Sequence, residues 1–170
     1  MNITQAKEQD IKQIVELVNS AYRGEASRAG WTTEADLIEG NKRTDETALA
    51  SEMKRHGAVI LKYATASGEI SGCVFLEKKG ESLYLGMLSV SPRLQARGIG
   101  KRLLEEASVY GKVNGCTRIY MTVISKRLEL VAWYERHGYK KNGNTKPFPN
   151  DNKFGKPVQP LEFIELEKAI

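Results

Sequence analysis

The chain has 170 residues, a length that predicts one domain with a single hydrophobic core. Hydrophobic residues make up 41% of it and charged residues 28%, a balance that excludes a largely disordered chain. Lys and Arg outnumber Asp and Glu by 26 to 21, and the net charge of +5 allows an anionic ligand without identifying one. Two cysteines are too few for a disulfide framework, which favours a reducing compartment.

No apolar stretch approaches the length of about 20 residues that is needed to cross a bilayer. The N-terminal residues do not form a charged segment followed by an apolar run. We therefore expect a soluble, cytoplasmic protein with no membrane partner.

The first third of the chain predicts one strand, over residues 2–6, and several helices. Apolar residues recur at three- and four-residue steps over residues 8–22, which predicts an amphipathic helix. Thr33 with Asp36 resembles a capping box and predicts a short helix after it. A further helix is expected to begin at Thr44 or Asp45 and to stop at residue 57, which is glycine.

The middle of the chain predicts a meander followed by two helices around a strand. Short turn segments rich in Gly and Ser separate three segments rich in β-branched and aromatic residues, which indicates two hairpins. The three expected strands are residues 58–65, 70–79 and 83–90, and after them we expect a helix over 98–114, a strand over 118–125 and a helix over 128–137.

Residues 142–160 contain four of the five prolines, so we expect a long loop there. This loop is interpreted as a lid or as a wall of a substrate pocket, with a subunit contact as the alternative. Residues 161–167 predict a final strand. The order of these elements predicts an α/β domain with a mixed sheet.

Residues 88–101 carry the most informative pattern in the sequence. A strand ends there, Pro92 interrupts its hydrogen-bonding ladder, and a loop with Gly98 and Gly100 opens a helix. The first amides of a helix have no partners within the helix, and together with the helix dipole they favour an anion. Arg93, Arg97, Lys101 and Arg102 add positive charge around this loop. An ordinary tight turn between strand and helix is the competing interpretation.

The spacing of the glycines narrows the choice of anion. There is no GxxxxGK[ST] motif for a nucleoside triphosphate, and the loop follows the fourth expected strand, which argues against a dinucleotide-binding fold. A diphosphate bound without a metal fits what remains, and no metal site is expected.

Val90, Pro92, Gln95, Gly98 and Gly100 stand in the pattern VxPxxQxxGxG, which resembles the acetyl-CoA motif of the GCN5-related N-acetyltransferases (GNAT). The segment WYERHGY at 133–139 resembles a second motif of that family, a helix with a Tyr four residues before a Gly-aromatic pair. The resemblance covers essentially the whole chain. It implies one GNAT-like domain: a mixed, mostly antiparallel sheet flanked by helices, with a splayed central strand pair. It also places the acetyl-CoA core at about 83–141 and acceptor-side helices at about 23–57.

The resemblance implies acetyl-CoA as cosubstrate and an amine acceptor as partner. Loop amides of residues 96–101 would hold the pyrophosphate, and the pantetheine arm would pair with residues 88–90. The implied cofactor-binding residues are Leu88, Ser89, Val90, Gln95, Ala96, Arg97, Gly98, Ile99, Gly100 and Lys101. Arg127 stands where relatives often have an Asn that touches the cofactor, and the sequence does not assign its contact.

The implied reaction is attack of a neutral primary amine, from a small molecule or a peptide, on the thioester carbonyl. Tyr134 is the expected catalytic residue and would hydrogen-bond the developing thiolate, transferring its proton late. An amide near Leu88 would donate to the carbonyl oxygen. The candidates for a base are Glu25, Glu34, Glu77 and Glu162, each with a surface charge as its alternative.

Several alternatives stay open at this stage. A CoA or acyl-CoA sensor without turnover is the main alternative to an enzyme. A nucleic-acid binder ranks last, because the basic residues concentrate at one loop. Trp31 lines the acceptor site or covers the core edge, Cys73 carries an acyl group or packs in the core, and homodimer formation is undecided.

Overall fold

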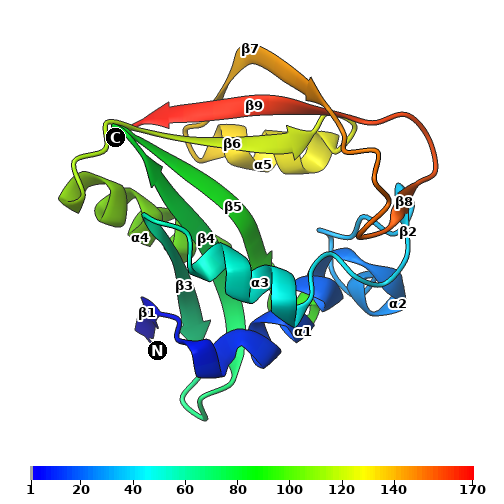
Figure 1. Cartoon of the computed structure of the whole chain (residues 1–170), viewed down its shortest axis with the longest axis horizontal. Coiled ribbons are helices and arrows are strands. Elements are labelled where there is room, and N and C mark those ends of the chain that lie inside the picture. The colour runs from blue at the N-terminus through cyan, green and yellow to red at the C-terminus, as the bar shows by residue number, and fades with distance from the viewer. Residues whose placement is uncertain (1) are drawn as a thin grey trace.

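The computed structural model describes residues 2–170, which form two sheets with helices around the larger one (Figure 1). The larger sheet has seven strands in the order β1-β3-β4-β5-β6-β9-β7, and only β5 and β6 are parallel neighbours. Its strands are β1 (Asn2–Gln5), β3 (Ala58–Ala64), β4 (Ile70–Lys79), β5 (Ser82–Val90), β6 (Arg118–Ile124), β7 (Lys140–Pro147) and β9 (Glu162–Ala169). The smaller sheet pairs β2 (Ile38–Glu39) with β8 (Lys156–Pro157). The expected mixed, mostly antiparallel sheet is confirmed.

Five α-helices and two short 3-10 turns complete the described part of the chain. They are η1 (Glu8–Asp10), α1 (Ile11–Tyr22), α2 (Gly24–Ser27), α3 (Glu46–Met53), η2 (Pro92–Leu94), α4 (Ile99–Val113) and α5 (Leu128–Arg136). The predicted helices over 8–22, 98–114 and 128–137 are thereby confirmed to within three residues at each end.

The alternation of side chains along β4 divides the core into two layers. Val74 belongs to a buried cluster that includes Leu103 of α4 and Val131 of α5, whereas Phe75 belongs to a second cluster with Ile14 of α1. Successive side chains of a strand point to opposite faces, so α1 and α4 cover opposite faces of the sheet. Because both faces are covered, β4 is buried along almost its entire length.

The predicted helix after Thr33 is wrong. The Thr33 hydroxyl lies 2.5 Å from the Ser27 hydroxyl and accepts the Ala35 N–H, so it stabilises a turn, and the chain continues into the short strand β2. The next helix, α3, is confirmed and begins after Asp45, but it ends at Met53, before the expected stop at residue 57. The Asp45 carboxylate accepts the Ala48 N–H at 2.8 Å and caps the helix, which decides between the two expected starts.

The expectation of a loop over 142–160 is wrong for its first part, because β7 runs to Pro147 along the edge of the sheet. Its register against β9 is interrupted between Lys141 and Thr145, which hides the regular alternation that marks a strand. Proline is tolerated on an edge strand, where one side of the backbone needs no partner. The rest of the segment is irregular apart from β8.

Candidate active site

The two parallel central strands separate along their length and open a wedge in the sheet (Figure 1). Pairing of β5 with β6 covers only Ser82 to Tyr84, opposite Arg118 to Tyr120. Beyond Tyr84 the two strands diverge, so the second half of β5 faces the wedge. The splayed pair expected from the sequence is present.

A bulge sits in the part of β5 that faces this wedge. Between Cys73 and Phe75 the register of β4 against β5 shifts by one residue, and Met87 adopts a left-handed conformation with φ of 54°. Such a backbone is strained for a residue with a side chain. The Tyr22 hydroxyl donates a hydrogen bond to the carbonyl of Leu88, which fixes the chain directly after the bulge.

The loop after β5 leads into α4 with the geometry expected of an anion site. Ala96 and Gly98 both have positive φ, 63° and 85°, and α4 begins at the next residue, Ile99. A Cβ on Gly98 would meet nothing within 4 Å, so the glycine is needed for its backbone conformation. A Cβ on Gly100 would come within 3.2 Å of the Trp133 ring, so glycine here permits close packing of α4 on α5.

The side chain of Gln95 braces this loop from within. Its Oε1 accepts the backbone N–H of Trp31 at 2.8 Å, and its Nε2 donates to the Thr32 hydroxyl and to the carbonyl of Val90. Two of these three hydrogen bonds join segments that are distant in the sequence, 64 and 63 residues apart. The side chain therefore holds the loop, while its backbone is the part left to face a ligand.

A cleft of about 640 Å³ lies between the loop, the end of β5 and α5. Nine of the sequence-predicted site residues line it: Leu88, Val90, Gln95, Ala96, Gly98, Ile99, Gly100, Lys101 and Tyr134. Two others do not, because Ser89 is buried at 2% exposure and Arg97 is exposed to solvent. Residues that sequence reasoning had not placed here include Tyr22, Leu130 and Ala132.

Tyr134 lines this cleft and is buried. Its ring packs edge-on against those of Trp133 and Tyr139, with centroids 5.1 and 5.8 Å away. Burial raises the pKa of its phenol well above the ordinary value, so the hydroxyl is neutral at physiological pH. A neutral phenol at this place can donate a hydrogen bond and retains a proton to give.

A second, smaller cavity of about 60 Å³ adjoins the cleft. Both spaces are lined by Tyr22, Leu88, Leu130 and Tyr134, which form a common wall. The charged residues that line the small cavity are Glu34, Arg43 and Arg127. We call this space the acceptor-end cavity, because it lies across that wall from the larger cleft.

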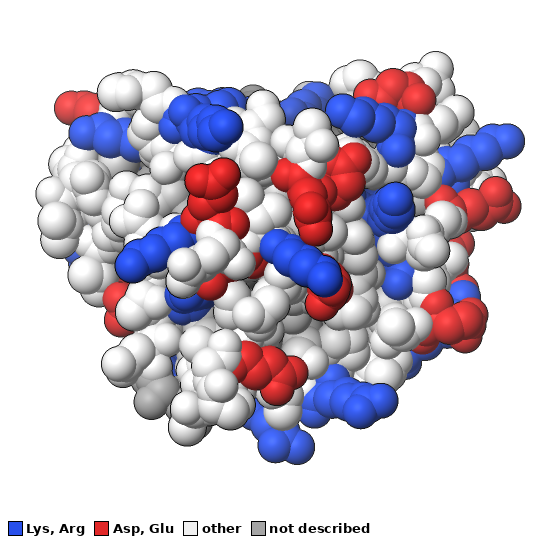
Figure 2. All heavy atoms as spheres, turned by 60° about the horizontal axis from the view of Figure 1, so that its bottom comes forward, with Lys and Arg blue, Asp and Glu red and all other residues white. Residues whose placement is uncertain are grey.

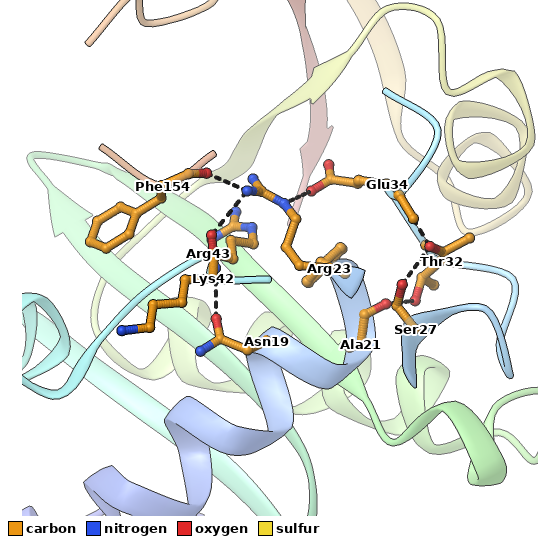
Figure 3. Close-up of polar contacts among 12 residues, drawn as sticks. Asn19, Ala21, Arg23, Ser27, Thr32, Glu34, Lys42, Arg43 and Phe154 are labelled. Carbon is orange, nitrogen blue, oxygen red and sulfur yellow. Dashed lines mark hydrogen bonds and ion pairs between the residues drawn. The ribbon is translucent and has the colours of Figure 1, made fainter. Parts of the chain in front are cut away.

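Glu34 is the one candidate base that lines either cavity. Its Oε1 pairs with the Arg23 guanidinium at 3.3 Å and its Oε2 with that of Arg127 at 3.4 Å. Figure 3 shows Arg23 reaching from the end of α1 to Glu34 on one side and to the carbonyls of Lys42 and Phe154 on the other. Both carboxylate oxygens are thus engaged within the protein.

The other candidate carboxylates lie elsewhere. Glu25 is exposed and pairs with Arg28, and Glu77 pairs with Arg55 at 2.9 Å. Glu162 is exposed on β9 opposite Pro147. The lining of neither cavity includes any of these three carboxylates, so the structure does not bring them to Tyr134.

The structure also shows the surroundings of three residues whose roles the sequence had left open. Arg127 donates to the carbonyl of Thr32 as well as to Glu34, so its side chain faces the acceptor-end cavity and not the loop before α4. Trp31 lines the large cleft, with its ring centroid 6.1 Å from that of Trp133. Cys73 is fully buried, and burial raises the pKa of its thiol to about 12, which favours the packing role.

Among residues 2–170 no group of three or more His, Cys, Asp or Glu side chains could hold a metal ion. No helix within the same residues is long and apolar enough to cross a membrane. Figure 2 shows acidic and basic side chains interspersed over one face of the molecule, without a continuous basic stripe.

A cleft beside a splayed strand pair, closed by a glycine loop and a buried phenol, is the arrangement of an acyltransferase of the GNAT type. Residues 11–139 match the model of the acetyltransferase (GNAT) family, and the chain belongs to this family of N-acetyltransferases.

Two curated relatives are similar to the chain, and one of them has an N-acetyltransferase name. The N-acetyltransferase YhfO of Bacillus subtilis is 29% identical over 148 residues, 84% of this chain and 91% of that protein. YdhI of the same organism is 29% identical over 73 residues, which spans 43% of this chain and 44% of YdhI.

Two crystal structures share the fold at low identity. The ribosomal-protein-S18-alanine N-acetyltransferase of Escherichia coli superposes with a TM-score of 0.72 at 15% identity, covering 99% of this chain and 93% of that one. The ribosomal-protein-alanine N-acetyltransferase of Brucella melitensis gives 0.73 at 16% identity and covers all of both chains.

Proposed function

We propose that the protein transfers the acetyl group of acetyl-CoA to a primary amine by direct attack. The neutral nitrogen forms a bond to the acetyl carbon and loses one proton, the carbon–sulfur bond breaks, and sulfur leaves as the thiolate of CoA, which takes up one proton. The observation that carries the proposal is the wall shared by the two cavities, which brings Leu88 and Tyr134 together where an amine could meet a thioester.

The large cleft fits the cosubstrate in size and in chemistry. Its volume of about 640 Å³ lies within the usual range for small-molecule sites. The bare amides of residues 96–101 and the positive end of α4 would hold the pyrophosphate, and Lys101 lines the same end. The segment Leu88 to Val90 has no strand partner on the β6 side and would pair there with the pantetheine arm, as with an added strand.

Each chemical task falls to a residue of the common wall. The amide of Leu88 follows the bulge and would donate to the thioester carbonyl oxygen, since the register assigns Leu88 no partner residue on β4 or β6. Tyr22 holds the carbonyl of the same residue, which belongs to the next peptide group, and so restrains the backbone on that side of Leu88. Tyr134 would donate to the sulfur as negative charge develops there.

The test combines binding with turnover. Calorimetry should detect acetyl-CoA binding, and release of CoA should follow when a panel of primary amines is added. A protein that does not bind acetyl-CoA would refute the proposal. A protein that binds it but acetylates no amine, with Tyr134→Phe leaving every property unchanged, would instead favour the sensor.

A further inference from the structure

The acceptor-end cavity contains one guanidinium that the fold does not use. Of its charged lining residues, Arg127 and Glu34 pair with each other, and Glu34 pairs also with Arg23 behind it. Within residues 2–170 the guanidinium of Arg43 has neither a hydrogen bond nor an ion pair, and its neighbour is the Tyr22 ring. Arg43 is partly buried and lines the cavity, so its unpaired guanidinium is available to bind a ligand there.

The fold fixes the position of Arg43 firmly. The Asn19 Oδ1 on α1 accepts the backbone N–H groups of Arg43 and Thr44, at 2.6 and 3.0 Å, and holds the chain against the helix (Figure 3). The Arg43 Cζ then lies 5.1 Å from the centroid of the Tyr22 ring. That ring belongs to the common wall, so the unused charge stands beside the place proposed for the acetyl group.

The charges around Arg43 favour an anion over a cation. Arg127 also lies over the Tyr22 ring, with its Cζ 5.7 Å from the centroid, so two guanidinium groups face one carboxylate in this cavity. The carboxylate of Glu34 is already held at both oxygens by Arg23 and Arg127 and forms no ion pair with Arg43. A cationic chain, such as that of a polyamine, would meet like charge here, which is an effective means of rejection.

We propose that the amine acceptor is a small amino acid, or a similarly compact amine that carries a carboxylate, and that Arg43 binds this carboxylate. The inference rests on the proposed function. An arginine suits the task because its planar fork can donate two parallel hydrogen bonds to a carboxylate. The cavity volume of about 60 Å³ has room for a compact polar head and not for a long chain.

The experiment uses matched sets of amines with the same side chain: an amino acid, its amide and the amine that lacks the carboxyl group. The ratio kcat/KM is measured for each by release of CoA, and binding of each to the CoA-loaded protein is measured by calorimetry. The variants are Arg43→Gln and Arg43→Lys. Arg55→Gln is the matched control, because Arg55 also lies over an aromatic ring, that of Phe75, and lines neither cavity.

We expect the wild-type protein to prefer the amino acid by about 10²-fold, which is near the upper end for a hydrogen bond between charged groups. Arg43→Gln should remove this preference while leaving acetyl-CoA affinity and the values for the two other amines within about threefold. Arg43→Lys should restore part of it, and Arg55→Gln should behave as wild type.

Equal use of all three amines by the wild-type protein would overturn the inference, and so would an equal loss for all three in Arg43→Gln. Where turnover is undetectable, the calorimetric preference for the amino acid and its dependence on Arg43 decide the question in the same way. Failure of the wild-type protein to bind acetyl-CoA would refute the proposed function. Normal acetyl-CoA binding without a preference for the amine that carries a carboxylate would refute only this inference.

Discussion

Replacing Tyr134 by Phe removes one oxygen from the common wall of the two cavities. The ring is held edge-on by Trp133 and Tyr139, and Phe keeps those contacts. Within residues 2–170 the hydroxyl has no hydrogen-bond partner, so its loss leaves no other polar group unpaired. We therefore expect the free energy of unfolding to change by less than about 0.5 kcal/mol, as for an innocuous substitution.

The expected effect on catalysis follows from the pKa of the phenol. Even an ordinary tyrosine, near pKa 10, would give its proton to a thiolate near 8.5 at a cost of about 2 kcal/mol. Burial raises the pKa of Tyr134 further, so complete transfer costs more and the hydroxyl acts mainly as a hydrogen-bond donor. A donor that acts only as charge develops contributes about 2.7 kcal/mol to the transition state, and its loss should lower kcat about 10²-fold.

The assay compares kcat with acetyl-CoA affinity in the Tyr134→Phe variant. The dissociation constant, measured by calorimetry, should stay within about threefold of the wild-type value. Tyr139→Phe is the matched control, because it removes a neighbouring buried hydroxyl that has no partner and that lines neither cavity. A kcat for Tyr134→Phe within twofold of wild type, with Tyr139→Phe equally active, would refute the assigned role.

Three further predictions concern the same site. Burial raises the pKa of Tyr134, so kcat at saturating substrates should not fall between about pH 8 and 10; a fall centred below pH 9 that Tyr134→Phe abolishes would contradict this. Gly98→Ala forces a side chain into a left-handed backbone, so the unfolding free energy in urea should fall by about 1 kcal/mol and acetyl-CoA should bind more weakly; unchanged affinity would separate the loop from the cosubstrate. Gln95→Leu leaves the Trp31 N–H and the Val90 carbonyl unpaired and should cost about 1–3 kcal/mol of stability; a thermal melting temperature equal to wild type would show that the brace is dispensable.

The sequence predicted the elements correctly where interactions between residues close in the chain determine the structure. The apolar period of α1 and α4 and the short turns between β3, β4 and β5 act over a few residues, and these elements were predicted correctly. The pair Thr33 and Asp36 failed, because the Thr33 hydroxyl found the Ser27 hydroxyl across a turn and no helix followed. Strand β7 failed for a related reason, since an edge position tolerates the proline and the irregular register that hide a strand.

The large cleft and the acceptor-end cavity also differ in how far the sequence predicts them. The proposed acetyl-CoA cleft draws mainly on residues 88–101 and 129–137, two short segments whose spacing is visible in the sequence. The charges of the acceptor-end cavity come from residues 34, 43 and 127, brought together only when α1, α5 and the segment before α3 pack around β5. These positions form no motif in the sequence. Arg43 becomes a candidate only because the structure shows that its guanidinium lacks a hydrogen-bond partner among residues 2–170.

The net positive charge of this cavity also bears on the base that the reaction needs. An amine must lose a proton before it attacks, yet both oxygens of Glu34 are occupied by arginines. Positive charge near an ammonium lowers its pKa, and one unit charge about 10 Å away, at an effective dielectric constant of about 20, contributes about 1.7 kcal/mol, or roughly one pKa unit. Arg43 and Arg127 can therefore favour the neutral amine, and Tyr22 and Tyr134, both raised in pKa by burial, add no negative charge to oppose them.

This electrostatic role of Arg43 predicts the direction in which the pH dependence of kcat should shift when Arg43 is replaced. In Arg43→Gln the ammonium of the bound acceptor loses a nearby positive charge and its pKa rises. The acid limb of kcat, measured at saturating amine and acetyl-CoA, should then move upward by about one pH unit, whereas Arg55→Gln should leave it in place. An acid limb unchanged in Arg43→Gln would mean that a titrating group outside this cavity takes the proton, and the guanidinium groups would then serve binding alone.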